Sequence, residues 1–198
     1  MKSLIISADE IKKGLEGYKP EEAEKFHSES AKIADKKLMQ AIKESHYDQV
    51  ILMCGGPASG KTEYLSEYLN ESGQIVVDGI LPTIEGAKIK IRNIIESGKK
   101  VSVHIVLPND IKSAFTAFLH RDRKFSDEHF YKKHSTSRQT ALYIAENYND
   151  IEIMLFHSKY EEGNLYFTEL VFNDKILMIE FLKENQLTED EIIKLVTT

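Results

Sequence analysis

The fold of this chain is decided by the stretch Gly55-Gly56-Pro57-Ala58-Ser59-Gly60-Lys61-Thr62. The stretch fits the pattern G-x-x-x-x-G-K-[S/T] of a phosphate-binding P-loop at every position. In such a loop, glycines let backbone N–H groups turn toward phosphate oxygens, and the lysine supplies a compact positive charge. The threonine hydroxyl is a ligand for Mg²⁺. The sequence therefore predicts that residues 55–62 bind the phosphates of ATP and that Thr62 helps to hold Mg²⁺.

The segments on both sides of the loop support this interpretation. Val50 to Cys54 is typical of a buried parallel strand, and Thr62 to Leu69 predicts a helix with Leu65 and Leu69 on one face. The loop would then deliver phosphates to a helix N-terminus, where free N–H groups and the helix dipole favour anions. A chance Gly/Ser turn is the alternative, and the strand before and the helix after the loop argue against it.

Strands and helices alternate along the rest of the chain. Further strands are expected at 74–79, 101–107, 151–156 and 165–172, and helices at 82–97, 111–120 and 140–148. This alternation predicts an α/β fold of the P-loop NTPase or kinase type, a three-layer sandwich with a mostly parallel sheet and helices on both faces. The last strand is expected to be antiparallel at the edge, because the connection 158–164 is too short for a crossover helix.

Helices are expected at both ends of the chain. A short one begins at the capping signal Ser7-Ala8-Asp9-Glu10, and a longer one, Glu21 to Ser45, carries a continuous apolar stripe. His27 on the longer helix could face a ligand, although a lone histidine there is more often solvated. Two C-terminal helices are expected at 176–184 and after the capping box that begins at Thr188. We therefore expect one domain, with N-terminal helices at 1–48, the P-loop core and lid at 49–157, and an edge strand with helices at 158–198.

Composition excludes several classes of protein. The chain has 26 Lys and Arg against 32 Asp and Glu, a formal net charge of −6, so we do not expect it to coat nucleic acid. Cys54 is its single cysteine, which excludes an internal disulfide framework and suits a reducing compartment. The N-terminus has no long apolar stretch, and no apolar run is long enough for a membrane span. We expect a cytoplasmic protein without a membrane partner.

Asp78 is the candidate acid of the site. It ends the predicted strand 74–79, an arrangement typical of the Walker B aspartate, which faces Mg²⁺ or a substrate hydroxyl. Asp78 is therefore expected to act as a general base or as a metal ligand. Hydrophobic strands also end in Asp-Gly turns for structural reasons alone.

The stretch from Leu119 to Arg138 is unusually basic for an acidic protein. It holds six Lys or Arg residues and three histidines in twenty residues. Phosphoryl transfer needs such charges, since the transition state spreads negative charge that guanidinium groups match. We interpret the stretch as a lid that carries Arg121, Arg123 and Arg138. The alternative is a solvated amphipathic segment that packs through its aromatic side chains.

Together these segments resemble the zeta toxins, a family of P-loop kinases. The resemblance rests on Phe26 to Ala31, the P-loop, Asp78-Gly79-Ile80-Leu81, and Arg121-Asp122-Arg123 leading to His134 and Arg138. It spans residues 20 to 157, and the P-loop is its only specific signature. The resemblance implies ATP-dependent phosphorylation of a UDP-N-acetylamino sugar, such as UDP-N-acetylglucosamine, on its 3′-hydroxyl. It also implies a toxin role and a possible antitoxin partner, for which the long helix could be a docking site.

The family resemblance also assigns roles to residues. Lys61 and Thr62 match the ATP- and Mg²⁺-binding positions, and Arg121, Arg123 and Arg138 match lid arginines that stabilise the transferring phosphoryl group. In the family, a strand with an aspartate follows the P-loop helix, and that strand and its acceptor-binding insertion are missing here. Asp78 would then be the only aspartate available to act as the base. The alternatives to a sugar-nucleotide kinase are a nucleoside or polynucleotide kinase and an ATP-binding switch module without turnover.

Overall fold

The computed structural model describes residues 1–161 and 163–198 and contains one six-stranded sheet in the order β1-β3-β2-β4-β5-β6. Five strands run parallel, and β6 is antiparallel to β5 at the edge. The predicted α/β fold with a mostly parallel sheet is confirmed. Residue 162, in the connection between β5 and β6, lies outside the described residues. The strands are β1 (Leu4–Ser7), β2 (Gln49–Cys54), β3 (Ile75–Asp78), β4 (Lys100–Pro108), β5 (Glu152–Glu161) and β6 (Asn164–Glu169).

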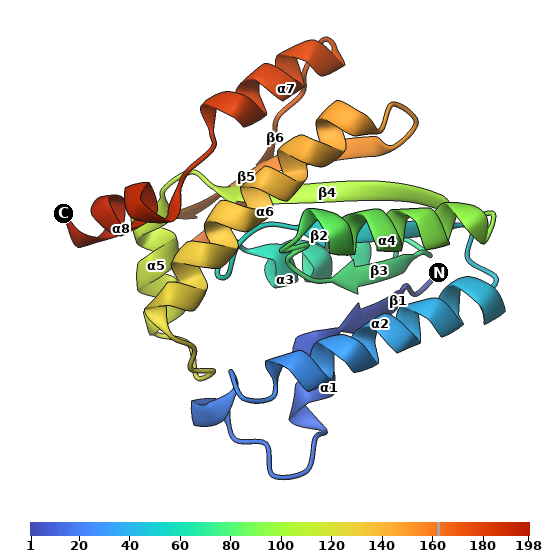
Figure 1. Ribbon diagram of the computed structural model, residues 1–198, viewed down its shortest axis with the longest axis horizontal. Coiled ribbons are helices and arrows are strands. Elements are labelled where there is room, and N and C mark those ends of the chain that lie inside the picture. The colour runs from blue at the N-terminus through green and yellow to red at the C-terminus, as the bar shows by residue number, and fades with distance from the viewer. Residues whose placement is uncertain (162) are drawn as a thin grey trace.

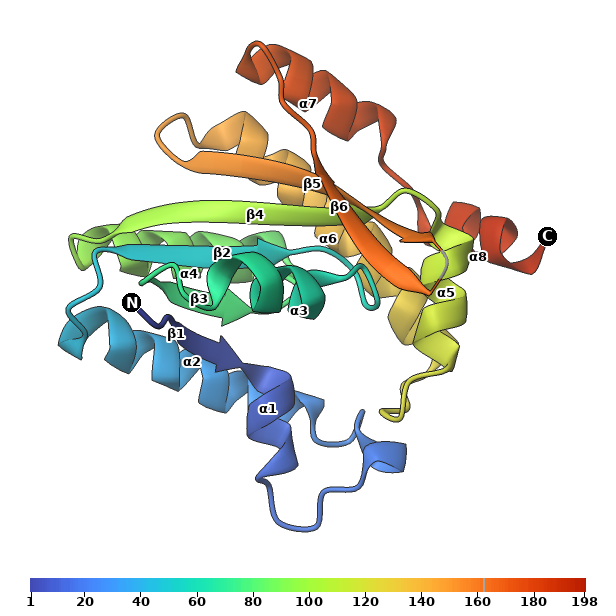
Figure 2. The same ribbon diagram turned by 180° about the vertical axis from the view of Figure 1, so that it is seen from behind.

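Helices cover both faces of this sheet (Figures 1 and 2). Side chains alternate along β2, so that Val50 and Leu52 pack beneath α2, α4 and α6, while Ile51 and Met53 pack beneath the P-loop helix on the other face. Both sets are buried because the strand is central in the sheet. The helices are α1 (Ala8–Lys13), α2 (His27–Glu44), α3 (Lys61–Tyr64) with its π-helical continuation η2 (Leu65–Leu69), α4 (Ile84–Glu96), α5 (Ile111–Leu119), α6 (Asp127–Asn147), α7 (Lys175–Glu184) and α8 (Glu189–Thr197), besides a 3₁₀ turn η1 (Pro20–Glu22).

The chain begins with a strand, which the sequence analysis did not predict. β1 pairs in parallel with β3 at the edge of the sheet, where Ser7 lies opposite Asp78. The apolar run Leu4-Ile5-Ile6 is too short to be distinguished from a frayed terminus by pattern alone. The expectation of helices alone over residues 1–48 is therefore wrong. The predicted capping position is correct, because the Ser7 side chain accepts a hydrogen bond from the Glu10 N–H.

The long N-terminal helix begins at His27 and not at Glu21. Residues 20–26 instead contact the connection between α5 and α6. The Lys124 N–H donates to the Pro20 carbonyl at 2.9 Å, and the Ser126 N–H donates to the Glu24 carboxylate at 3.0 Å. These tertiary hydrogen bonds compete with continuation of the helix, which explains the later start.

The segment interpreted as a lid divides in two. Residues 120–126 connect α5 to α6, whereas residues 127–138 are the first half of the single helix α6, whose N-cap is Ser126. Phe130, His134 and Arg138 are spaced four residues apart and are all buried on one side of α6. This half of the predicted lid is therefore a packed structural element. None of the helices described here combines the length and the apolar character needed to cross a membrane.

Candidate active site

A cavity lies at the carboxyl ends of the parallel strands, the edge at which open α/β sheets bind ligands. The P-loop forms one wall, Asp78 and Gly79 after β3 form another, and the connection between α5 and α6 covers it. Among the predicted site residues, the cavity is lined by Pro57, Ala58, Ser59, Gly60, Lys61, Thr62, Asp78, Arg121 and Arg123.

Two P-loop glycines are required by their surroundings. Gly55 has a φ of 142°, and a Cβ there would lie 2.3 Å from the Val106 carbonyl oxygen. A Cβ on Gly56 would lie 2.3 Å from the ring of His134. The loop is thus pressed between strand β4 and helix α6, and side chains at these positions would force it out of shape.

His134, on α6, packs against the P-loop. Its Nε2–H donates to the Pro57 carbonyl at 2.8 Å, and burial holds the pKa of the imidazole well below its ordinary value of 6.5. Its Nδ1 is buried and has no hydrogen-bond partner among the described residues. The ring is therefore neutral and acts on the shape of the loop. The sequence analysis placed His134 at the end of a lid, and the structure places it beneath the loop.

Lys61 is buried at the start of α3. Its ammonium donates to the Gly56 carbonyl at 2.6 Å and to the Ser59 hydroxyl at 3.2 Å. Burial lowers the pKa of Lys61 to about 8, and the nearby Asp78 carboxylate partly offsets that effect. A buried ammonium whose hydrogen-bond partners are all neutral is suited to bind a phosphate, because an anion would restore the charge partner that burial removes.

Thr62 and Asp78 both line the cavity and carry oxygen atoms of the kind that bind a divalent cation. Thr62 is exposed on the cavity wall, and Asp78 ends β3, the strand next to the P-loop strand. The described residues contain no group of three or more His, Cys, Asp or Glu side chains that could hold a metal without other ligands. Mg²⁺ suits such a site, since it is usually bound through one or two protein oxygens together with substrate phosphates and waters.

The Asp78 side chain is half-buried. The Ser7 hydroxyl donates to its Oδ2 at 3.1 Å, across the β1–β3 pair. Burial nevertheless raises the pKa of Asp78 above its ordinary value of 3.8, because desolvation of the charged form outweighs the attraction of Lys61. A carboxylate with a raised pKa accepts a proton more readily, as a general base requires.

With this geometry established, the chain can be compared with known proteins. No protein-family model matches the sequence, and no curated protein matches it. Among solved structures, it is similar to a chain of the AvrRxo1-ORF1:-ORF2 complex with ATP, at 13% identity over 82% of this chain and 73% of that chain, with a TM-score of 0.54. The native form of that complex matches at 12% identity over 86% and 83% of the two chains, with a TM-score of 0.51. This chain and the matched chain of the AvrRxo1 complex share a fold.

A weaker match is a chain of the PezAT chromosomal toxin–antitoxin system of Streptococcus pneumoniae, at 13% identity over 86% of this chain and 92% of that chain, with a TM-score of 0.38. The likeness to the AvrRxo1 complex shows a shared fold. Activity has to be argued from the residues of this chain.

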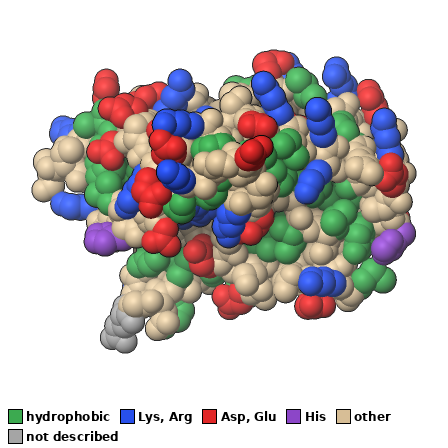
Figure 3. All heavy atoms as spheres, turned by 90° about the horizontal axis from the view of Figure 1, so that it is seen from below, with side chains coloured by type: hydrophobic (Ala, Val, Ile, Leu, Met, Phe, Trp, Pro, Cys, Tyr) green, Lys and Arg blue, Asp and Glu red, His purple; other side chains and the backbone are tan. Residues whose placement is uncertain are grey.

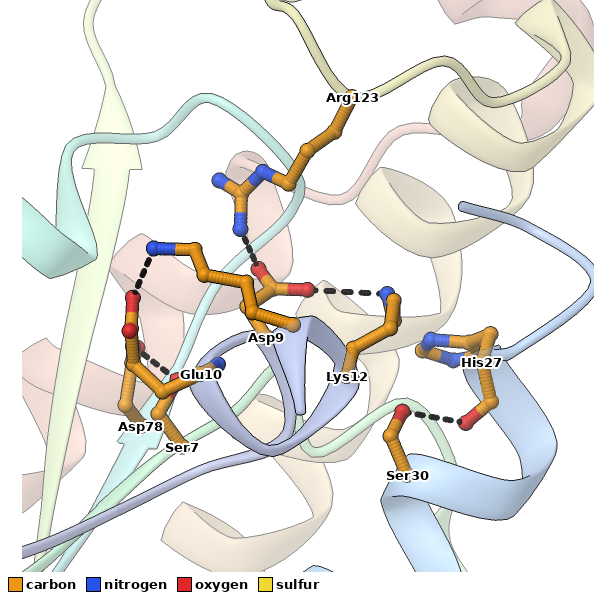
Figure 4. A network of polar contacts seen from close by, with 9 residues as sticks. Ser7, Asp9, Glu10, Lys12, His27, Ser30, Asp78 and Arg123 are labelled. Atoms are coloured by element: carbon orange, nitrogen blue, oxygen red, sulfur yellow. Dashed lines mark hydrogen bonds and ion pairs between the residues drawn. The ribbon is translucent and has the colours of Figure 1, made fainter. Parts of the chain in front are cut away.

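The structure adds Asp9 to the site, a residue that the sequence analysis did not single out as functional. Asp9 lies on α1, directly after β1, and lines the cavity beside Asp78. Figure 4 shows its carboxylate between Arg123, with which it forms an ion pair, and Lys12, whose ammonium lies 3.0 Å away. Burial raises the pKa of Asp9, but Arg123 and Lys12 outweigh this effect and lower it below 3.8. The signal in the sequence was the short apolar run Leu4 to Ile6 with an acid three residues after it, a weaker pattern than the one that identified Asp78.

Phe125, His27 and His129 complete this wall of the site, and Lys12 lies behind it. The Lys12 side chain is fully buried, and its ammonium lies 4.7 Å from the centre of the Phe125 ring. His27 and His129 lie edge to face with their ring centres 5.4 Å apart, and both line the cavity. α1, α2 and the connection between α5 and α6 are thereby joined around the pocket.

The predicted lid arginines occupy different places. Arg121 and Arg123 line the cavity, whereas Arg138 does not. The Arg138 guanidinium is buried and donates to the carbonyl of Asn185, the residue after α7, at 3.0 Å. Burial lowers the pKa of Arg138 to about 10. In this structure Arg138 joins α6 to the C-terminal helices, away from the P-loop cavity.

Proposed function

We propose that this chain is an ATP-dependent phosphotransferase that moves the γ-phosphoryl group of ATP to a hydroxyl group of a small acceptor. The observation that carries the proposal is that Lys61, Asp78 and Arg121 line one cavity at the carboxyl ends of the strands. These are a phosphate-binding ammonium, a carboxylate with a raised pKa and a guanidinium, the three kinds of group that phosphoryl transfer uses. The fold shared with a protein solved with ATP supports ATP as the donor.

In this proposal Asp78 has two roles, as a ligand for Mg²⁺ and as the base, and each of the other residues has one. The backbone of residues 55–60 and Lys61 bind the ATP phosphates, and Thr62 with Asp78 would hold Mg²⁺, which neutralises phosphate charge when bound. The acceptor oxygen bonds to the γ-phosphorus while the bond to the ADP oxygen breaks, and the hydroxyl proton goes to Asp78. Arg121 and Arg123 balance the charge that develops on the phosphoryl oxygens.

The first acceptor to test is a UDP-N-acetylamino sugar, because the sequence resembles the zeta toxins. A toxin role and binding to a protein antitoxin follow from the same resemblance. The 3′-hydroxyl of UDP-N-acetylglucosamine would have to reach Asp78 from the side of the cavity away from the P-loop.

A nucleoside kinase is the second candidate, and a polynucleotide kinase has less support. Figure 3 shows the face formed by the N-terminal elements, where acidic and basic side chains are interspersed. This face does not present the continuous basic surface that typically binds nucleic acid, and the net charge of the chain is −6. Retention on nucleic acid with a steep salt dependence would favour the polynucleotide kinase. Tight ATP binding without turnover would favour a switch module.

The experiment is a measurement of ADP release from Mg²⁺·ATP without an acceptor, with UDP-N-acetylglucosamine, with nucleosides and with uncharged hydroxyl compounds. Lys61→Ala serves as the blank, since it removes the phosphate-binding charge. We expect acceptor-stimulated ADP release that is absent in the variant. Release that is equal in the wild type and in Lys61→Ala, with every acceptor tried, would contradict the proposed function.

A further inference from the structure

A second cavity adjoins the nucleotide site. It has a volume of about 280 Å³ and lies between α2, the loop of residues 79–83 and the first turns of α4. Asp9, His27, Asp78, Gly79 and Ile80 line both cavities. The two cavities therefore meet at two carboxylates, one of which is the proposed base. We refer to this second space as the α2–α4 cavity.

The walls of the α2–α4 cavity are mostly apolar. On α2 the apolar lining residues are Ala31 and Ala34, one turn apart, and their small side chains leave the space open, while His27 and Asp35 are the polar ones. Leu81, Pro82 and Ala87 line the opposite side. Concave apolar walls with a few polar groups at one end are the usual design of a small-molecule site. The volume suits a compound of one or two rings.

The loop that forms the opposite wall is held in a fixed shape. Leu81 is buried and has a φ of 48°, a left-handed conformation that is strained for a residue other than glycine. The Ile80 carbonyl accepts a hydrogen bond from the Gly55 N–H at 3.4 Å, so this wall is connected to the P-loop itself. Thr83 caps α4 through a hydrogen bond from the Gly86 N–H at 3.1 Å.

The charges that face the α2–α4 cavity are unsuited to an anion. Among the described residues that line it, Lys90 is the single Lys or Arg, and its ammonium is paired with the Asp35 carboxylate at 2.5 Å. Asp9, Asp35 and Asp78 also line it. Asp9 is paired with Arg123 and Lys12, and Asp35 is paired with Lys90. Among the described lining residues, a phosphate in this space would therefore meet the carboxylate of Asp78, which forms no ion pair, and no unpaired ammonium or guanidinium group.

We propose that the α2–α4 cavity binds the body of the phosphoryl acceptor, and that this acceptor is a small hydroxyl compound whose body is uncharged. The inference rests on the proposed phosphotransferase function and names the substrate class of that site. The apolar body lies between Ala31 and Leu81, and its hydroxyl reaches the junction at Asp78. A nucleotide sugar such as UDP-N-acetylglucosamine does not suit this site, because its diphosphate would lie against the carboxylates.

The test uses a matched pair of probes, benzyl alcohol and benzyl phosphate, which differ only in the phosphate. Each is titrated into the full chain, with a non-hydrolysable ATP analogue on the P-loop, while the ¹³C-labelled alanine methyl groups are observed by NMR. We expect benzyl alcohol to shift the signals of Ala31, Ala34 and Ala87. Benzyl phosphate should bind there at least about tenfold more weakly, as expected for an anion placed against like charges.

Two substitutions make the result specific. Ala31→Phe fills the α2–α4 cavity and should abolish the shifts at Ala34 and Ala87 without changing the affinity for ATP. Ile89→Phe, on the exposed side of α4, is the matched control and should change neither. Asp35→Asn leaves Lys90 without its carboxylate and should strengthen binding of benzyl phosphate. Equal binding of the two probes, or no shift with benzyl alcohol, would overturn the inference.

The inference and the proposed function fail separately. If UDP-N-acetylglucosamine stimulates ADP release equally in the wild type and in Ala31→Phe, the phosphotransferase stands and the acceptor assignment is wrong. If benzyl alcohol binds as expected but no acceptor stimulates ADP release, the cavity is a ligand site and the phosphotransferase proposal fails.

Discussion

The carboxylate of Asp9 and the guanidinium of Arg123 form an ion pair that joins α1 to the connection between α5 and α6. Asp9 is among the first residues of the chain, and Arg123 comes from the basic stretch interpreted as a lid. Both residues line the cavity that the P-loop lines. The N-terminal strand and helix are therefore part of the site, which leads to the first prediction.

Asp78→Asn and Asp9→Asn should affect different steps. Asp78→Asn removes the proposed base and should lower kcat by about 10²–10⁴-fold while ATP still binds, the range typical of general base catalysis. Asp9→Asn releases Arg123 and leaves the buried Lys12 without its carboxylate, so it should lower thermal stability as well as kcat. Single-turnover kinetics and thermal denaturation separate the two. Near-normal turnover in Asp78→Asn would show that Asp78 is not the base.

The same two residues should have opposite effects on stability as pH changes. The pKa of Asp78 is raised by burial, so its ionisation destabilises the fold, and Asp78→Asn should raise Tm at pH 7. That gain should disappear below the unfolded pKa of about 3.9. The pKa of Asp9 is lowered, with Arg123 and Lys12 outweighing burial, so its contribution is present above the unfolded pKa and is lost as pH falls through the folded pKa. Denaturation curves between pH 3 and pH 8 measure both effects.

Substitution of Arg121 should lower turnover, whereas substitution of Arg138 should lower stability. Arg121 lines the cavity, and Arg121→Ala should lower kcat by about 10²–10³-fold, toward the low end of the effect of an arginine that stabilises the transition state. Arg138→Met loses the hydrogen bond to Asn185 and should cost about 1–3 kcal/mol of stability with kcat unchanged. If Arg138→Met instead remained stable but lost turnover, Arg138 would be a lid arginine after all.

ATP affinity should depend on the ionisation of Lys61. Burial lowers its pKa to about 8, and a bound phosphate would raise it again. As pH rises above 8, the neutral Lys61 amine must take up a proton when ATP binds, so the Kd for ATP should rise by about tenfold per pH unit. Lys61→Met should lack this slope. Titrations with a fluorescent ATP analogue between pH 7 and pH 10 test the prediction, and a flat wild-type profile would contradict it.

Because Gly56 and His134 are in contact, substitutions at the two positions should have non-additive effects on stability. Gly56→Ala places a Cβ 2.3 Å from the His134 ring, and we expect a loss of about 1–3 kcal/mol of stability together with weaker ATP binding. Adding His134→Ala removes the clash, so the double variant should be more stable than the two single losses would predict if they were independent. His134→Gln, which keeps a donor for the Pro57 carbonyl, is the control for the loss of the hydrogen bond. Strict additivity would show that the two residues do not press on each other.

Local sequence determined the P-loop, the parallel strands other than β1, and the cap positions at Ser7 and Thr188. Residues 55–62 could be recognised because their chemistry depends on a short, contiguous order of residue types. The strands around them could be recognised because central strands are apolar on both faces. Asp78 could be recognised for a similar reason, since an apolar strand that ends in an acid is a pattern of consecutive residues.

The tertiary structure alone decided which distant residues meet. β1 is four residues long and becomes a strand because β3 offers it a free edge, which brings Ser7 and Asp9 to Asp78. Arg121 and Arg138 come from one basic stretch, yet the start of α6 at residue 127 sends one to the cavity and the other to the C-terminal helices. The α2–α4 cavity arises from small side chains on elements far apart in sequence. The sequence pattern shows the periodicity of a single helix or strand, whereas packing depends on which faces of different helices and strands come into contact.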